Sequence, residues 1–243
     1  MLGFTRSGPA CSASRSASPS ASTTVKTPSG ADSISSFNTD FSDPKFIGQT
    51  AYGREELLKE EKEVTYQKWC AFKDDNKALA VINSSTYGGS AKDNILNITL
   101  MRTPVYSAHP INQRPITDND RFHNHIDMGE RDFSYRLTPE FNNIDVEAEI
   151  FNQPPFVLSF FPSGNGEKKE TECKIDNSKI LLSSYKQINN EEYLLRLFNT
   201  SDIEEITKIS INGKELEIKF TPYEAKGFIL KEDNLIECNL IGE

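Results

Sequence analysis

Three residues of the segment HNHID have the types and the spacing of a metal site. In an extended strand, His123, His125 and Asp127 project from the same face, and two imidazoles with one carboxylate are ligands that zinc accepts. The sequence offers no identifiable fourth ligand, and the neighbouring Arg, Asp and Asn residues are typical of a polar loop. We therefore reject this cluster as a metal site and expect no metal or other cofactor in this chain.

Other patterns that carry chemistry are incomplete. The sequence has no Gly-x-Ser-x-Gly nucleophile elbow, and Gly88-Gly89 lacks the Lys-Ser/Thr pair of a phosphate-binding loop. Adjacent acids such as Asp74-Asp75 are expected on solvated faces, because two-carboxylate catalysis needs a pair that flanks one bond. Trp69 and the tyrosines could stack on sugar rings, although most aromatic residues of β-proteins lie in the core. Residue types and spacing alone thus predict no catalytic residue.

From residue 62 onward, the sequence indicates mostly β-strands. Runs of apolar and aromatic residues, about ten residues apart, are bounded by Asn, Gly, Asp and Pro. This pattern predicts an all-β, antiparallel β-sandwich region rather than βαβ units. Asn212-Gly213 predicts a tight type I′ hairpin between two such runs. The predicted strands lie within 64–72, 77–83, 94–102, 131–137, 155–161, 179–185, 192–198, 207–211, 214–220, 226–230 and 234–240.

Composition and breaks in the pattern predict the domain organisation. Residues 1–36 contain eleven Ser and few apolar side chains, which predicts a disordered leader. Short helices are expected at 54–63 and 145–151, and the Asn-Gln-Pro-Pro break at 152–155 predicts a boundary. We therefore expect a leader over 1–36, a larger sandwich over 37–152 and a smaller C-terminal β-sandwich over 153–243.

Overall charge and hydropathy exclude some classes of partner. The 243 residues carry a formal net charge of −9, which argues against a nucleic-acid partner, since nucleic acids bind clustered Lys and Arg. No apolar run approaches the roughly 18 residues of a membrane helix. Four scattered Cys fit a reducing compartment, and we expect a cytoplasmic location. The Ser-rich, acid-poor leader leaves an organelle open.

Four segments, in this order, resemble the C-terminal part of glycoside hydrolase family 38, the α-mannosidases. They are IGQTAYGREELL (47–58), residues 78–110 with the strand Leu-Met-Arg-Thr-Pro (100–104), IDMGERDFSYRL (126–137) and ILLSSYKQINNEEYLLRLFNTS (180–201). The family's own His-x-His-x-Asp metal motif lies near the start of its catalytic domain and continues into a Trp-containing segment. Because Asp127 is followed here by Met-Gly-Glu-Arg-Asp-Phe, the metal role is not transferred to HNHID.

The resemblance implies a β-sandwich tail of a retaining, zinc-dependent α-mannosidase. The nucleophile and the zinc of that family belong to a catalytic domain that this chain does not contain, so the chain alone is expected to be inert. Its partners would be that catalytic domain, in cis or in trans, and α-mannoside glycans, and a homo-oligomer is left open. The alternatives are a stand-alone carbohydrate-binding module, which predicts an exposed Trp69 or Tyr platform, and a functionless gene fragment, which predicts exposed apolar surface.

The same resemblance suggests which residues would form a rim of the active site. The best candidates are Arg102, Tyr87 and Asp127. The alternative for Arg102 is an ion pair with Asp127 or Glu130 that pins its loop, and the alternative for Tyr87 is to close the turn with Gly88.

Overall fold

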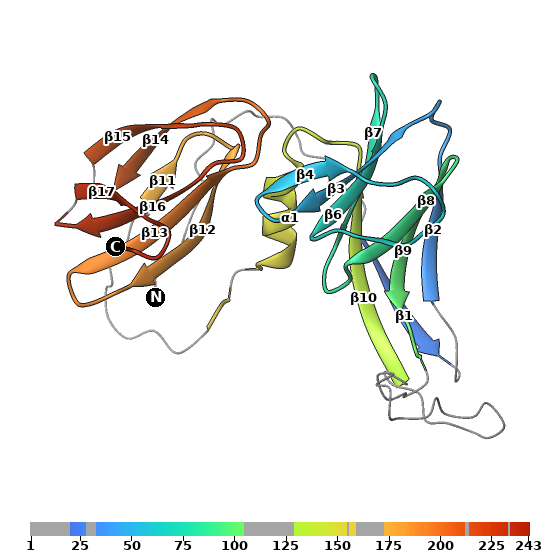
Figure 1. Ribbon diagram of the computed structural model, residues 1–243. Coiled ribbons are helices and arrows are strands. Elements are labelled where there is room, and N and C mark those ends of the chain that lie inside the picture. Colours follow the sequence, from blue (N-terminus) through green and yellow to red (C-terminus); the bar gives the residue numbers. More distant parts are fainter. Residues whose placement is uncertain are drawn as a thin grey trace, which may run out of the picture. The chain divides into compact units, whose positions relative to one another are not determined.

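The computed structural model describes residues 20–27, 33–104, 129–154, 156–158, 173–211, 214–232 and 234–243. Over these residues the chain forms antiparallel sheets and one helix (Figure 1). The described residues divide into two compact units. We call residues 18–48 and 55–141 the N-terminal unit, and residues 49–54 and 142–243 the C-terminal unit. The predicted all-β, antiparallel fold is confirmed.

The N-terminal unit contains two sheets that enclose one core. The strand orders are β1-β10-β7-β6-β3-β4 and β2-β9-β8-β5. Buried residues of both sheets meet in the core, among them Phe72 and Val81 from the first sheet and Leu96 and Ile98 from the second. The strands are β1 Ser20–Thr27, β2 Ser33–Asn38, β3 Lys45–Thr50, β4 Gly53–Glu56, β5 Val64–Thr65, β6 Trp69–Lys73, β7 Ala78–Asn83, β8 Gly88–Lys92, β9 Ile95–Met101 and β10 Gly129–Thr138. Residues 49–54, which include the end of β3 and the start of β4, belong to the C-terminal unit.

The C-terminal unit has the same construction on a smaller scale, with one helix added. Its strand orders are β11-β14-β15 and β12-β13-β16-β17, and its core combines Ile209 and Phe220 from the first sheet with Leu195 and Phe228 from the second. The elements are α1 Ile144–Asn152, β11 Cys173–Ile175, β12 Ile180–Gln187, β13 Glu192–Asn199, β14 Glu205–Ile211, β15 Lys214–Phe220, β16 Ala225–Lys231 and β17 Asn234–Cys238. Each unit is therefore a β-sandwich.

Trp69 lies on the face of β6 opposite to Cys70 and Phe72, which belong to the core of the N-terminal unit. Its side chain is 0% exposed and packs edge-to-face on Phe141, with 5.6 Å between the ring centroids. A fully buried ring cannot stack on a sugar in solution, so Trp69 does not supply the aromatic platform that a stand-alone carbohydrate-binding module predicts.

Two stretches of the leader expected over residues 1–36 are described as strands. Strand β1 pairs with β10 from Ser20↔Arg136 to Thr27↔Gly129, and β2 pairs with β9. Both are edge strands of their sheets. A strand that adds to an existing edge is held by main-chain hydrogen bonds, which do not require an apolar composition. The low apolar content on which the expectation rested was therefore not decisive.

The helix expected over residues 54–63 does not form. Strand β4 ends at Glu56, and residues 57–63 are not helical. Leu57 packs against the core of the N-terminal unit, and its amide donates a 2.7 Å hydrogen bond to the carbonyl of Phe46. Two adjacent leucines provide no apolar stripe at helical spacing, so an extended chain buries Leu57 and leaves Leu58 exposed.

Three further predictions have clear outcomes. The helix expected at 145–151 is confirmed as α1. The division between the units follows Phe141 rather than residue 152, because α1, whose Ile144 and Ala148 are fully buried, belongs to the C-terminal unit. Residues 212–213 lie outside the described part, but Ile211 pairs with Lys214, so β14 and β15 form the two-residue hairpin that was predicted. The turn type stays a prediction.

The strand expected at 155–161 is not confirmed. Residues 156–158 are described and are not in a strand, and the remaining positions of the segment lie outside the described residues.

Candidate functional site

Two of the three predicted rim residues lie at neighbouring strand ends of the N-terminal unit. Tyr87 immediately precedes β8 and Arg102 immediately follows β9. In the ladder of these strands Gly88 pairs with Thr99, and on its other side Gly88 pairs with Thr65 of β5. Asp127, like His123 and His125 of the rejected metal cluster, lies outside the described residues.

Glu63 occupies the centre of this region, and sequence reasoning did not select it. One Nη of Arg102 lies 2.6 Å from Glu63 Oε2, and the Thr99 hydroxyl donates a 2.5 Å hydrogen bond to Glu63 Oε1. A Cβ on residue 88 would lie 2.7 Å from Glu63 Oε1, so the carboxylate fits because that residue is glycine. We call Glu63, Tyr87, Gly88, Thr99 and Arg102 the Glu63 site.

The Glu63 site is a surface suited to binding rather than to acid–base chemistry. The side chains of Arg102 and Glu63 are 53% and 32% exposed, and Tyr87 is 60% exposed. The exposed Tyr87 ring offers a face for stacking, and the Arg102 guanidinium offers hydrogen-bond donors. The Glu63 carboxylate already accepts from Arg102 and Thr99. Arg102 forms an ion pair with Glu63; its alternative pairing with Asp127 or Glu130 stays a prediction.

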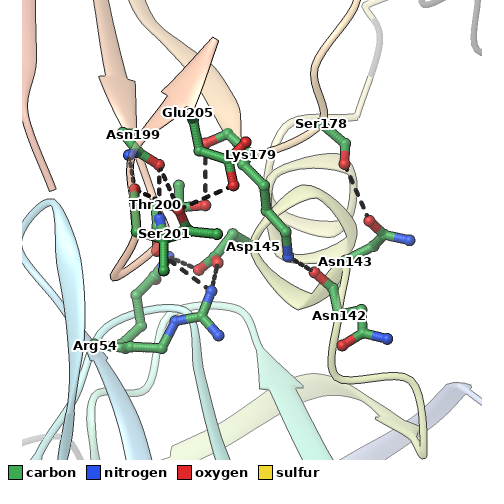
Figure 2. A network of polar contacts seen from close by, with 12 residues as sticks. Arg54, Asn142, Asn143, Asp145, Ser178, Lys179, Asn199, Thr200, Ser201 and Glu205 are labelled. Carbon is green, nitrogen blue, oxygen red and sulfur yellow. Dashed lines mark hydrogen bonds and ion pairs between the residues drawn. The ribbon is translucent and has the colours of Figure 1, made fainter. Parts of the chain in front are cut away.

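A second polar cluster lies in the C-terminal unit, around the first turn of α1 (Figure 2). Asp145 is 4% exposed. Its Oδ2 lies 2.8 Å from an Nη of Arg54, and its Oδ1 accepts a 3.2 Å hydrogen bond from the Gln49 amide. The same Nη of Arg54 donates to the carbonyl of Thr200 at 3.3 Å. We call this the Asp145 network.

The Asp145 network continues through the loop after β13. Asn199 is buried, and its Oδ1 accepts from the amide and the hydroxyl of Ser201, both at 2.9 Å. Its amide nitrogen donates to the carbonyls of Ile203 and Thr221. Lys179 donates to the carbonyl of Asn142, and Ser178 donates to Asn143 Oδ1, so the start of α1 is held from a second direction (Figure 2). The polar groups of the network are paired with one another, which is typical of a structural role. The network links residues 49–54, the start of α1 and the loop after β13, and we call it a structural joint.

Two tyrosines in the left-handed backbone region border this joint. Tyr52 has φ 59° and Tyr223 has φ 55°, and bulky residues adopt this conformation rarely. The Tyr52 ring packs edge-to-face on Phe198, with 5.2 Å between centroids, and the Tyr223 ring covers Gly53, where a Cβ would lie 3.2 Å from the ring. Burial, and then the charge of Asp202, raise the pKa of the Tyr223 hydroxyl. These contacts hold residues 49–54 against the C-terminal sandwich.

The thiols of the described residues are not activated nucleophiles. Burial raises the pKa of Cys70 to about 12 and that of Cys173 to about 11. Burial is also the largest cause of the raised pKa of Cys238. A thiol with a raised pKa is protonated at neutral pH and reacts slowly. The described residues also include no group of three His, Cys, Asp or Glu side chains placed to hold a metal ion.

Within the described ranges, no helix combines the length and the apolar character needed to cross a membrane.

Comparisons with known proteins agree with this architecture. Residues 23–120 match the family model described as "Glycosyl hydrolases family 38 C-terminal domain". No curated protein matches the chain. Fourteen chains of solved structures match. One is an alpha-mannosidase from Enterococcus faecalis V583, with a TM-score of 0.64 and 15% identity over 80% of this chain and 25% of that chain. Another is a protein in glycosyl hydrolase family 38 from Enterococcus faecalis, with a TM-score of 0.69 and 15% identity over 85% and 27%.

Proposed function

We propose that this chain, whose residues 23–120 carry a glycosyl hydrolases family 38 C-terminal domain, is a non-catalytic β-sandwich portion of an α-mannosidase-like hydrolase. The observation that carries the proposal is the coverage of the structural match. The fold extends over 80% of this chain, but it spans only 25% of the alpha-mannosidase that shares it. In this proposal the chain is a scaffold that completes the pocket of a catalytic domain, bound in cis or in trans.

The surroundings of Glu63 and Asp145 agree with a scaffold. Retaining hydrolysis of a glycoside needs a nucleophile and an acid/base held about 5 Å apart across the scissile bond. Glu63 is engaged by Arg102 and Thr99, and Asp145 is engaged by Arg54 and Gln49. We assign the nucleophile and the zinc to the catalytic domain, and α-mannoside glycans are its proposed substrates.

The experiment that tests the proposal is hydrolysis of p-nitrophenyl-α-mannoside by the purified chain with zinc or cobalt added. We expect no turnover above buffer. Metal-dependent turnover would overturn the scaffold assignment and return attention to His123, His125 and Asp127. Addition of a family 38 catalytic domain in trans is expected to raise turnover above that of the catalytic domain alone.

The Glu63 site gives the proposal its sugar-facing residues. We assign Arg102 and Tyr87 to the rim, together with Asp127. In a reconstituted enzyme, Arg102→Ala and Tyr87→Ala should raise KM for the mannoside more than kcat falls, because a rim contact contributes binding that does not change during the reaction. Lys45→Ala is the matched control, since Lys45 is an exposed cation with an acidic partner, Glu56. Equal effects in all three variants would contradict the assignment.

A second candidate is a stand-alone carbohydrate-binding module, and the exposure of the Tyr87 ring is the observation that favours it. It predicts saturable binding of methyl α-mannoside to the chain without any partner, with loss of binding in Tyr87→Ala. The buried Trp69 weighs against this candidate.

A further inference from the structure

A cavity of about 430 Å³ lies beside α1 in the C-terminal unit, and its walls are largely apolar. One wall is α1, with Val146, and the others are β11 and β12, with Cys173, Ile175, Ile180, Leu182 and Tyr185. Cavities of roughly 300–1,000 Å³ are large enough to hold a small organic molecule or several side chains. β12 is an edge strand of its sheet, so the cavity lies where a further segment of chain can be accommodated.

Several of the polar side chains that line the cavity are already paired within the unit. The Gln153 amide donates to Glu149 Oε2 at 2.7 Å, and Arg196 donates to the Ser184 hydroxyl at 2.9 Å. Asn177 donates to Glu205 and to the carbonyl of Ile206. A polar ligand would have to compete with these bonds, whereas an apolar occupant would leave them intact and gain buried area.

A short apolar segment that could occupy the cavity begins three residues after Gln153. Phe156, Val157 and Leu158 are 78%, 76% and 57% exposed, and they follow Gln153, which lines the cavity. An extended chain advances roughly 3.3 Å per residue, so Phe156 lies at most about 10 Å along the chain from Gln153, which lines the cavity. Adjacent exposed apolar side chains commonly mark a surface that packs against something.

We infer that Phe156–Leu158 is a strap that closes over this cavity. Side chains of an extended segment alternate between its two faces, and in the closed state Phe156 and Leu158 enter the cavity while Val157 faces out. The closed strap covers the Cys173 thiol and extends the core of the C-terminal unit. This inference does not depend on the mannosidase proposal, because it uses only residues of the C-terminal unit and neither the Glu63 site nor the comparisons with known proteins.

Cys173 allows a direct test, because a disulfide forms only between cysteines whose Cα atoms come within about 7 Å. The variants Phe156→Cys, Leu158→Cys and Val157→Cys of the full chain are oxidised with oxidised glutathione, and the disulfides are mapped by mass spectrometry. Ile203→Cys is the control, since Ile203 is a 61% exposed apolar residue of the same unit. We expect Phe156→Cys or Leu158→Cys to pair with Cys173 several-fold more than Val157→Cys or Ile203→Cys. If neither exceeds these two controls, the strap does not close.

A second measurement does not depend on a new cysteine. If the strap closes, Phe156→Ser lowers the urea midpoint and raises the rate at which a thiol reagent labels Cys173, while Ile203→Ser changes neither. An unchanged midpoint and an unchanged labelling rate in Phe156→Ser would overturn the inference, because an exposed Phe156 has nothing to lose.

Discussion

The Asp145 network predicts a specific pattern of stability loss. Asp145→Ala leaves Arg54 without its carboxylate, and the side chain of Arg54 is only 18% exposed. It also removes the acceptor of the Gln49 amide and an acid from the first turn of α1. Breaking a buried ion pair from one side costs about 3–5 kcal/mol. Because Arg54 retains some access to water, we expect a loss at the lower end, about 3 kcal/mol.

The assay is urea unfolding of the full chain, followed by circular dichroism. With a slope of about 2 kcal/mol per molar urea, the midpoint should fall by about 1.5 M. Asp145→Asn keeps the shape and an acceptor for Gln49, so it should cost less. Glu204→Ala is the control, because Glu204 forms an exposed ion pair with Lys219 and such pairs contribute about 0–1 kcal/mol.

A double variant separates the ion pair from its surroundings. Arg54→Met combined with Asp145→Leu replaces both charges by apolar side chains, so neither charge is left buried and unpaired. Its loss should be smaller than the sum of the single losses. If Asp145→Ala costs no more than Glu204→Ala, or if the single losses simply add, the network is not the joint that we describe.

Three other predictions follow from the N-terminal unit. Gly89→Ala should lower the urea midpoint, because its Cβ would lie 2.6 Å from the carbonyl oxygen of Asn97 and 2.9 Å from the Tyr66 ring, and overpacking of this kind costs about 1–3 kcal/mol. Burial raises the pKa of Cys70 from 9.0 to about 12, so its contribution to stability is complete below pH 9 and is lost as the pH rises toward 12. Urea midpoints at pH 8 and pH 10.5 should therefore differ less in Cys70→Ala than in the parent. Arg102→Ala should change stability by less than about 1 kcal/mol in thermal unfolding, because its ion pair with Glu63 is partly exposed; a larger loss would make Arg102 a structural residue.

The strand pattern was readable from the sequence because burial follows alternation. In β9 the buried residues Leu96, Ile98 and Leu100 occur at every second position. The same period of two is visible in the order of apolar residues in the sequence. The same reasoning failed for β1 and β2, which are edge strands. Their position is determined by the unpaired edges of β10 and β9, and those edges exist only once the sheets have formed.

The candidate site was readable only in part. Arg102 and Tyr87 were selected on a resemblance, and the register of β8 and β9 brings their ends together. Glu63 was not selected because it stands in a run of acids from Glu55 onward that are alike in the sequence. The pairing of Thr65 with Gly88, and of Gly88 with Thr99, is what brings Glu63 to face Arg102.

The Asp145 network shows the same limit on a larger scale. Arg54 and Thr200 are 146 residues apart in the sequence, and although both lie in segments that resemble family 38, nothing in those segments indicates that the two residues pair. Contacts of such long range follow from the assembled unit, so a polar residue in a loop gives no sign of the partner it will have.

The hydrogen-bond partners of the Glu63 and Asp145 carboxylates give the physical argument for a scaffold. A catalytic acid or base must have hydrogen-bonding capacity left for the substrate, and its surroundings must favour transfer of a proton. Glu63 instead shares its two oxygens between Arg102 and Thr99, and Asp145 shares its two oxygens between Arg54 and Gln49. Both carboxylates are therefore used to fix backbone segments in place. In the proposed function, the Tyr87 ring and the Arg102 guanidinium, both exposed at the Glu63 site, contact a sugar that another domain holds.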